Sequence, residues 1–337
     1  MMSIFYGCEK LKSLPDISKW NTDKVINCSL IFSGCKALKS LPDISKWNIY
    51  NPKIKLSKLD LLFELIRYMN NAELLKELLG LLIIKYLPDM QVGTTLLEFL
   101  EHIFFSLSGL FDGCSSLEKI PDISKWNTNK VKEFDNMFYG CSSLEELPDI
   151  SKWKVSNFDS MEGFFDGCEE LKVLPDISKW NTNQIKIMTN IFRGCSSLNS
   201  IPDISNWKVN NVDNMEGLFD GCEALKELPD ISKWSTNQLK IMTNMFRGCL
   251  SLYSIPDISK WEVSKVTNAN NMFDHCKSLL CLPDLSKWDH IIKLIPKIIE
   301  SFDISNSSNN SSSIFMIVVT LKMKKTQIKM IQIVKYK

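Results

Sequence analysis

The six residues Pro15-Asp16-Ile17-Ser18-Lys19-Trp20 spell PDISKW, and this stretch decides the fold because it returns along most of the chain. PDISKW occurs seven times, and the near copies PDISNW and PDLSKW begin at Pro202 and Pro283. The prolines that open the nine copies are Pro15, Pro42, Pro121, Pro148, Pro175, Pro202, Pro229, Pro256 and Pro283. Neighbouring prolines are 27 residues apart, except that Pro42 and Pro121 are 79 apart. A fixed period of roughly 20–50 residues is typical of a solenoid, in which each coil buries its apolar face against the next.

Within each coil, nine positions stay apolar when the motif proline is counted as position 1. In the coil that begins at Pro121 these residues are Ile123, Trp126, Val131, Phe134, Met137, Phe138, Cys141, Leu144 and Leu147. Positions 11, 14, 18 and 21 are spaced like one face of a helix, which predicts a short helical segment over residues 131–141. Residues 144–150, LEELPDI, predict a short strand that enters a bend marked by the proline. The expected fold class is therefore an α/β solenoid of 27-residue coils.

The same residues resemble a known class of repeats. The order of Pro, Trp, Met-Phe, Gly-Cys and Leu in PDISKW…V..M..MF.GCSSL..L resembles the BspA-like leucine-rich repeats of bacterial and protist surface proteins, over about residues 1–47 and 104–288. One strand with one short helical segment per coil is also leucine-rich-repeat geometry. The resemblance implies a right-handed solenoid, a role in adhesion or protein binding, and no shared catalytic residues. It also implies a cell-surface or secreted location if the N-terminus is incomplete, whereas the lack of a signal-peptide pattern favours the cytoplasm.

Two regions interrupt the pattern. The gap of 79 is one period plus 52 residues, and residues 48–103 are Leu-rich with helical spacing. Three interpretations stay open for them: a helical insertion packed on the solenoid, decayed repeats, or a gene-model error such as a translated intron. Residues 289–337 hold the polar low-complexity stretch ISNSSNNSSS and end in a basic tail. The expected domains are thus coils at 1–47, the insertion or degenerate repeats at 48–103, the main solenoid at 104–288, and the linker with its tail at 289–337.

Two polar columns alternate in charge with a period of two coils. Position 12 holds in turn Lys132, Asp159, Lys186, Asp213, Lys240 and Thr267, and position 19 holds Tyr139, Asp166, Arg193, Asp220, Arg247 and Asp274. Stacked coils are expected about 5 Å apart, so each column places opposite charges side by side. Pro148–Ile201 matches Pro202–Ile255 at 42 of 54 aligned positions, so recent duplication of a two-coil unit explains the pattern equally well.

Three further columns invite chemical interpretations. The nine cysteines at position 21 lack the close pairing that zinc sites require, and they predict a buried column of thiols, with Cys28 and Cys281 outside the pattern. The aspartates at position 2 are expected to accept hydrogen bonds from turn N–H groups beside the lysine column at position 5, rather than to bind calcium. The tryptophans at position 6 share the phase of the core leucines, which predicts burial rather than a carbohydrate or peptide platform.

These observations predict a non-enzymatic scaffold for protein–protein interaction or adhesion. A net charge of +1 gives no reason to expect nucleic acid or an anionic membrane surface. No run reaches the roughly 18 apolar residues of a membrane span, and no catalytic or metal constellation stands out. No cofactor is expected, the oligomeric state stays open, and a truncated or decaying repeat copy with no dedicated partner is the alternative. The candidate surface for a partner protein consists of outward residues at positions 25 and 26, namely Glu118, Lys119, Glu145, Glu146, Lys172, Asn199, Lys226, Glu227 and Tyr253.

Overall fold

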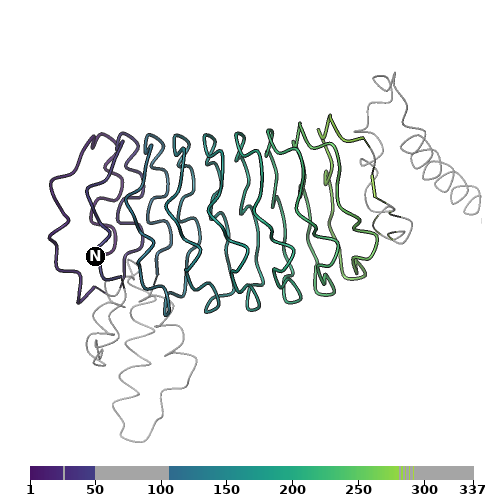
Figure 1. The fold of residues 1–337 in the computed structure, drawn as a ribbon, viewed down its shortest axis with the longest axis horizontal. Coiled ribbons are helices and arrows are strands. Elements are labelled where there is room, and N and C mark those ends of the chain that lie inside the picture. Colours follow the sequence, from purple (N-terminus) through teal and green to yellow (C-terminus); the bar gives the residue numbers. More distant parts are fainter. Residues whose placement is uncertain are drawn as a thin grey trace, which may run out of the picture.

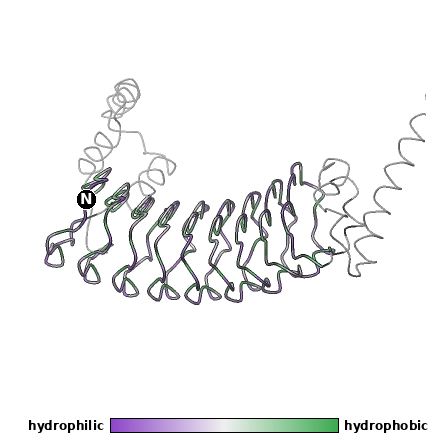
Figure 2. Ribbon diagram, turned by 90° about the horizontal axis from the view of Figure 1, so that it is seen from above, coloured by the Kyte–Doolittle hydropathy of each residue, from purple (hydrophilic) through white to green (hydrophobic). Residues whose placement is uncertain are grey.

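The computed structural model describes residues 1–25, 27–49 and 106–280, together with Leu282, Pro283, Leu285, Trp288 and Ile291. These residues form coils that lie side by side along one axis, from the N-terminal end in purple to the C-terminal end in green (Figure 1). Seen from above, hydrophobic residues return at the same place in successive coils (Figure 2). The predicted repeat solenoid is therefore confirmed.

Inside a coil, the backbone is a series of tight turns. In one central coil the N–H groups of Met137, Cys141 and Leu144 each donate to the carbonyl three residues earlier, at 3.1–3.2 Å. The N–H of Trp126 bonds to the Ile123 carbonyl in the same way, at 3.1 Å. Bonds of this kind close β-turns. These turns bend the chain so that each 27-residue repeat completes one coil of the solenoid.

Peptide groups on one side of each coil bond to the next coil. The N–H groups of Asn136, Phe138 and Gly140 donate to the carbonyls of residues 162, 164 and 166 at 2.7–3.1 Å. At position 13 the backbones approach as isolated parallel bridges, which join Ser106 to Glu133, Ser160 to Ile187, Ile187 to Asn214, Asn214 to Ile241, and Ile241 to Asn268. These bonds connect equivalent positions of neighbouring coils and so hold the stack in register.

The secondary structure of the coil differs from the expectation. Residues 131–141, predicted as a short helical segment, consist mostly of turns, and residues 144–150, predicted as a strand, form no strand among the described residues. A helix requires each N–H to donate four residues back, whereas alternate N–H groups here donate to the next coil. Asn136 and Gly140 also have positive φ angles of 56° and 64°, which interrupt right-handed helical geometry. Pro148 lacks an N–H and therefore cannot donate to a ladder of strands.

Aromatic side chains fill the interior of the coils. The rings at position 18 stack from Phe5 to Phe273 with centroids 5.6–5.9 Å apart. From Trp47 onward each Trp is at most 5% exposed, which confirms the predicted burial of this column. From Trp47 to Trp261 the indole N–H donates to the position-3 carbonyl of the preceding coil at 3.0–3.3 Å. Trp20 lies in the first described coil and is 37% exposed.

The cysteine column is buried as predicted. From Cys35 to Cys276 the periodic thiols are at most 6% exposed, whereas Cys8, in the incomplete coil that precedes Pro15, is exposed. Each buried thiol donates to the position-18 carbonyl of the preceding coil, at 2.9–3.2 Å. Burial raises the pKa of Cys35 to about 11. A neutral thiol in an apolar interior is a poor nucleophile, so these side chains contribute packing rather than reactivity.

The coils on either side of residues 50–105 contact each other directly. The Cys114 thiol donates to the Phe32 carbonyl at 3.1 Å, and the Trp126 indole N–H donates to the Ile44 carbonyl at 3.2 Å. The rings of Phe32 and Phe111 stack with centroids 5.9 Å apart. Residues 1–49 and 106–280 therefore belong to one continuous stack. The predictions for the helical insertion and for the C-terminal linker and tail fall almost entirely outside the described residues.

Candidate interaction surface

The outward residues at positions 25 and 26 of successive coils, called the strip below, follow the buried leucine at position 24. The structure exposes all nine residues that the sequence placed there: Glu118, Lys119, Glu145, Glu146, Lys172, Asn199, Lys226, Glu227 and Tyr253. Backbone bonds align them, because the N–H of Asn199 donates to the Lys172 carbonyl at 3.3 Å and that of Tyr253 to the Lys226 carbonyl at 3.2 Å. Side chains from coils far apart in sequence thus lie along one row of the stack.

Charges near the N-terminal end of the strip pair with each other. Lys39 lies 3.1 Å from Glu118, and Lys119 lies 3.3 Å from Glu146, in both cases between nitrogen and carboxylate oxygen. The four side chains are 52–72% exposed. Pairs this exposed contribute little to stability because water and salt screen them. Their effect is to neutralise this part of the strip.

Farther along, the strip carries exposed apolar side chains. Val173, Tyr253 and Leu280 are 54%, 37% and 63% exposed. Beyond residue 20, only one other large hydrophobic residue of the described chain is exposed, namely Tyr139 at position 19. Sequence reasoning selected Tyr253 but missed Val173 and Leu280, although both occupy positions 26 and 25. Selecting every residue at positions 25 and 26, whether polar or apolar, would have included them.

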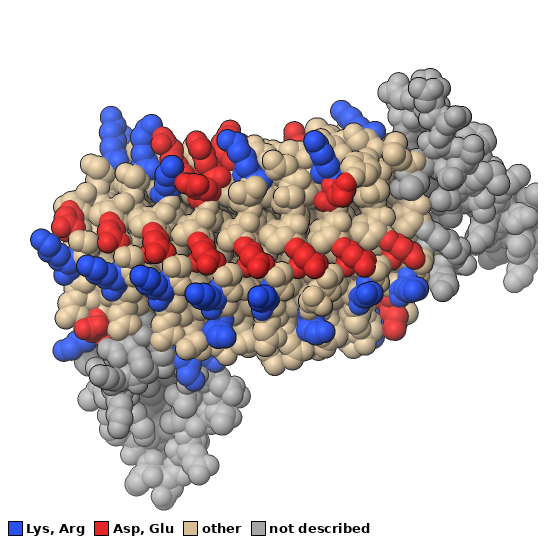
Figure 3. Space-filling model, in the orientation of Figure 1, with Lys and Arg blue, Asp and Glu red and all other residues tan. Residues whose placement is uncertain are grey.

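A row of aspartates and a row of lysines follow a different line on the coils. Asp16 accepts from the Ser18 backbone N–H at 3.0 Å, and the same bond recurs at position 2 of every described coil through Asp257. The Ser18 hydroxyl and N–H together lower the pKa of Asp16. The predicted turn role of these aspartates is confirmed. Figure 3 shows an acidic row beside a basic row along the length of the molecule, as positions 2 and 5 require.

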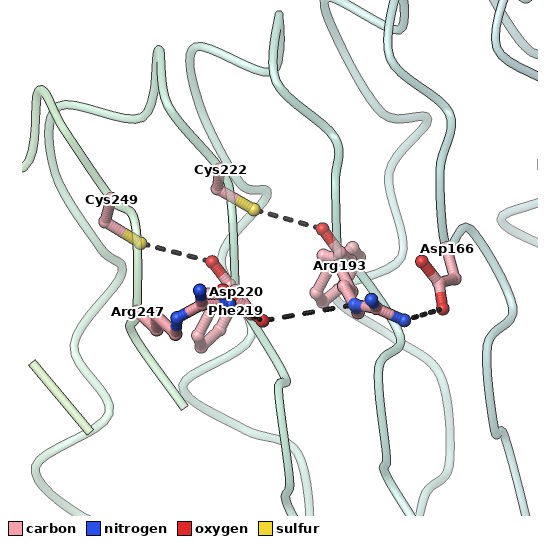
Figure 4. A network of polar contacts seen from close by, with 8 residues as sticks. Asp166, Arg193, Phe219, Asp220, Cys222, Arg247 and Cys249 are labelled. Atoms are coloured by element: carbon pink, nitrogen blue, oxygen red, sulfur yellow. Dashed lines mark hydrogen bonds and ion pairs between the residues drawn. The ribbon is translucent and has the colours of Figure 1, made fainter. Parts of the chain in front are cut away.

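The alternating charges at position 19 meet as the sequence predicted. Arg193 Nη1 lies 3.5 Å from Asp166 Oδ2, and Arg247 Nη1 lies 3.6 Å from Asp220 Oδ2 (Figure 4). Arg193 Nε also reaches Asp220 Oδ2 at 3.9 Å. The aspartate side chains are 8% and 11% exposed and the arginines nearly half exposed. Burial raises the pKa of Asp166 to about 6 even though the guanidinium of Arg193 favours its charged form.

The pairs at position 12 are shorter and more exposed. Lys186 Nζ lies 3.2 Å from Asp159 Oδ2, and Lys240 Nζ lies 3.0 Å from Asp213 Oδ2. The side chains of these four residues are 37–62% exposed. Both predicted columns therefore bring opposite charges together across coil boundaries.

A cavity of about 280 Å³ lies near the N-terminal end of the stack. Small polar side chains, including Ser29, Ser106 and Ser108, line it together with Asp112, Glu133 and Asp135. Burial raises the pKa of Asp135 to about 6. No sequence signal pointed to this cavity.

The described part of the chain shows neither a metal-binding cluster nor a membrane-spanning helix. Among those residues no cluster of three or more His, Cys, Asp or Glu side chains has the arrangement of a metal site. Within the same residues, no helix has the length and apolarity that crossing a bilayer requires.

A protein-family model matches three segments of the chain. The model described as "Mycoplasma protein of unknown function, DUF285" matches residues 1–71, 105–227 and 200–315. Together these segments cover well over half of the chain. A search of curated proteins finds no match.

Solved structures with some similarity are leucine-rich-repeat proteins by their own descriptions. A leucine-rich repeat protein from Eubacterium ventriosum is 20% identical, with a TM-score of 0.31 over 51% of this chain and 41% of that one. The leucine-rich repeat protein of T. pallidum is 21% identical, with a TM-score of 0.26 over 47% and 73%. A leucine-rich cell surface protein from Faecalibacterium prausnitzii is 17% identical, with a TM-score of 0.17 over 54% and 77%. The chain thus spans less than half the length of the Eubacterium protein.

Proposed function

The chain belongs to the family described as a Mycoplasma protein of unknown function, DUF285, and because that description assigns no activity, we propose a function from the surface of the solenoid. We propose that the protein is a non-enzymatic scaffold that binds another protein through the strip at positions 25 and 26. In this proposal the coils are right-handed leucine-rich repeats of the BspA-like type, and the binding serves adhesion or assembly.

The contrast between a uniform interior and a varied strip carries the proposal. The Trp, Phe and Cys columns of the interior keep the same residue type from coil to coil, whereas the strip changes in charge, size and polarity between neighbours. Among the described residues beyond residue 20, four large hydrophobic residues are exposed, and three of them lie on the strip: Val173, Tyr253 and Leu280. Exposed apolar side chains next to polar ones are typical of protein-binding surfaces, where aromatic residues often supply most of the affinity.

Photo-crosslinking in the source cell tests this proposal. A benzophenone amino acid replaces Tyr253 on the strip in one variant and Tyr139 in the other. Tyr139 is a matched control because it is 42% exposed, compared with 37% for Tyr253, but lies at position 19. We expect a discrete crosslinked protein from position 253 and none from position 139.

The two remaining outcomes contradict the proposal. Equal crosslinking from both positions indicates non-specific contact. The absence of a crosslink at 253, in a protein whose melting temperature is unchanged, favours the alternative of a repeat copy without a dedicated partner. The serine variants Val173→Ser and Leu280→Ser extend the test, since both should weaken a crosslink made from position 253.

A further inference from the structure

The coils of the stack are of two kinds that alternate along the chain. Threonine coils have Thr at position 8, and aliphatic coils have Ile or Val there. The residues at this position are, in order, Thr22, Ile49, Thr128, Val155, Thr182, Val209, Thr236 and Val263. All eight are buried. The two kinds also differ at positions 12, 16 and 19.

The contacts found only where an aliphatic coil follows a threonine coil are hydrogen bonds and a close steric fit. The Thr128 hydroxyl accepts from the Lys154 N–H at 2.7 Å, and the Thr182 hydroxyl accepts from the Lys208 N–H at 2.7 Å. Thr182 also donates to the Lys208 carbonyl at 3.1 Å. A buried Thr hydroxyl thereby satisfies backbone groups of the next coil, which an aliphatic side chain cannot do.

Position 16 adds a steric requirement at the same boundary. The side chain of Asn136 lies over Gly163, so that a Cβ atom on Gly163 would be only 2.1 Å from Asn136 Oδ1. Asn190 stands over Gly217 in the same way, at 2.2 Å. The Asn of a threonine coil therefore fits against Gly in the coil that follows. At the last such boundary Asn271 replaces Gly, and there the Oδ1 atom of Asn244 is buried without a hydrogen-bond partner.

The contacts found only where a threonine coil follows an aliphatic coil are ion pairs. Asp159 pairs with Lys186, and Asp213 pairs with Lys240. The buried carboxylates of Asp166 and Asp220 pair with the arginines of the coils that follow them (Figure 4). The bond of Arg193 to Asp220, at 3.9 Å, extends the charge network across the other boundary as well.

From these contacts we infer that each coil accepts only a coil of the opposite kind as its neighbour, so that the unit of the stack is a 54-residue pair. Two adjacent aliphatic coils would place Asp against Asp at positions 12 and 19, and the pair at position 19 is mostly buried, where salt screens repulsion poorly. Placing the threonine coils that begin at Pro175 and Pro229 next to each other would put Lys186 against Lys240 and Arg193 against Arg247. The alternation is thus a physical rule for register as well as a record of duplication.

The alternation keeps its phase across residues 50–105. Ile49 at position 8 precedes that segment, and Gly109 and Asp112 at positions 16 and 19 follow it. These residue types at positions 8, 16 and 19 are typical of an aliphatic coil. Leu30 of the preceding threonine coil lies over Gly109, where a Cβ would approach it at 2.5 Å. The two halves therefore complete one aliphatic coil between the threonine coils that begin at Pro15 and Pro121.

Deletions of one coil and of two coils test the inference in the full chain. Removing residues 175–228 takes out one pair and joins Asp159 and Asp166 to Lys240 and Arg247. Removing residues 175–201 takes out one threonine coil and joins them to Asp213 and Asp220. We expect the single-coil deletion to melt lower than the two-coil deletion by about 5 °C or more, although it keeps 27 more residues.

Two controls separate the rule from a general loss of stability. The single-coil deletion that also carries Asp213→Lys and Asp220→Arg should regain a large part of the lost melting temperature. The part of the penalty that comes from the exposed charges at position 12 should also be smaller in 1 M than in 0.05 M salt, as expected for repulsion between exposed like charges. If the single-coil deletion melts at or above the two-coil deletion, or if the compensating substitutions leave it as unstable, the coils are interchangeable and the inference is wrong.

Discussion

The buried columns and the strip belong to the same coils but differ in how they vary. The Trp, Phe and Cys columns repeat almost without change, whereas the strip changes residue type at nearly every coil. The Trp indoles and Cys thiols donate to carbonyls of the preceding coil, and the Phe rings stack on one another. In a solenoid each coil contacts only its neighbours, so any change in a buried column affects two boundaries. The strip faces away from those boundaries and is free to vary. Stability thus depends on the buried columns, and the proposed recognition depends on other positions of the same repeat.

The largest expected effect comes from shortening a buried column. Trp180 is 4% exposed, stacks on Trp207 with ring centroids 6.4 Å apart, and donates to the Ile150 carbonyl at 3.2 Å. We expect Trp180→Ala to reduce the free energy of unfolding by about 3–5 kcal/mol, measured by urea denaturation. Tyr253→Ala on the strip is the matched comparison and should change it by less than about 0.5 kcal/mol. Similar losses in the two variants would remove the distinction between column and strip.

The next effect concerns the close approach of neighbouring backbones. Gly217 has φ of 58°, and a Cβ there would meet Asn190 Oδ1 at 2.2 Å. Gly217→Ala should therefore cost about 2–3 kcal/mol, from positive φ and overpacking together. Gly7→Ala isolates the backbone contribution, because Gly7 has φ of 69° and nothing within 4 Å of its Cβ site. The double variant Asn190→Gly, Gly217→Ala should recover the amount by which the cost of Gly217→Ala exceeds that of Gly7→Ala, because it removes the side chain that the new Cβ would meet. If Gly217→Ala loses no more free energy of unfolding than Gly7→Ala, the neighbouring coils move apart easily and their close approach is not a constraint.

Sequence and structure agree where a property depends on the repeat alone. Burial of Trp180 and Cys195, and the pairing of Arg193 with Asp166, follow from the period and from residue type. The helical segment was wrong because apolar spacing of three and four residues also suits successive turns. What decides between them is the partner of the Asn136 N–H, a carbonyl in the next coil, and local spacing carries no information on such a distant bond.

The candidate surface was predictable in position but not in content. Positions 25 and 26 are outward because they follow the buried leucine, and the structure exposes all nine residues chosen from them. The apolar character of the strip at Val173 and Leu280 was missed because exposed positions were expected to be polar. The cavity beside Asp135 depends on how small residues of separate coils combine in space, which one coil considered alone does not reveal.

A smaller effect is expected from pH, through carboxylates that belong neither to the apolar columns nor to the strip. Burial raises the pKa of Asp135 from 3.8 to about 6. Between about pH 4 and pH 6 the folded state then binds more protons than the unfolded state, so the free energy of unfolding rises as the pH falls through this range. We expect the melting temperature to be about 2–4 °C higher at pH 5 than at pH 7. Asp135→Asn should raise the melting temperature at pH 7 and weaken its dependence on pH. If the melting temperature of this variant changes with pH as much as that of the parent protein, the effect does not come from Asp135.

The smallest effect is expected from the charges of the strip itself. Lys119 and Glu146 lie 3.3 Å apart and are 69% and 65% exposed. Lys119→Glu should shift the melting temperature by less than about 2 °C, because exposed ion pairs contribute little, and the double variant Lys119→Glu, Glu146→Lys should match the parent protein. A large loss in the single variant would mean that the strip stabilises the stack, as the buried columns do. If stability is indifferent to these charges, as we expect, folding does not determine which charges the strip carries, and any selection on them acts through what the strip contacts outside the molecule.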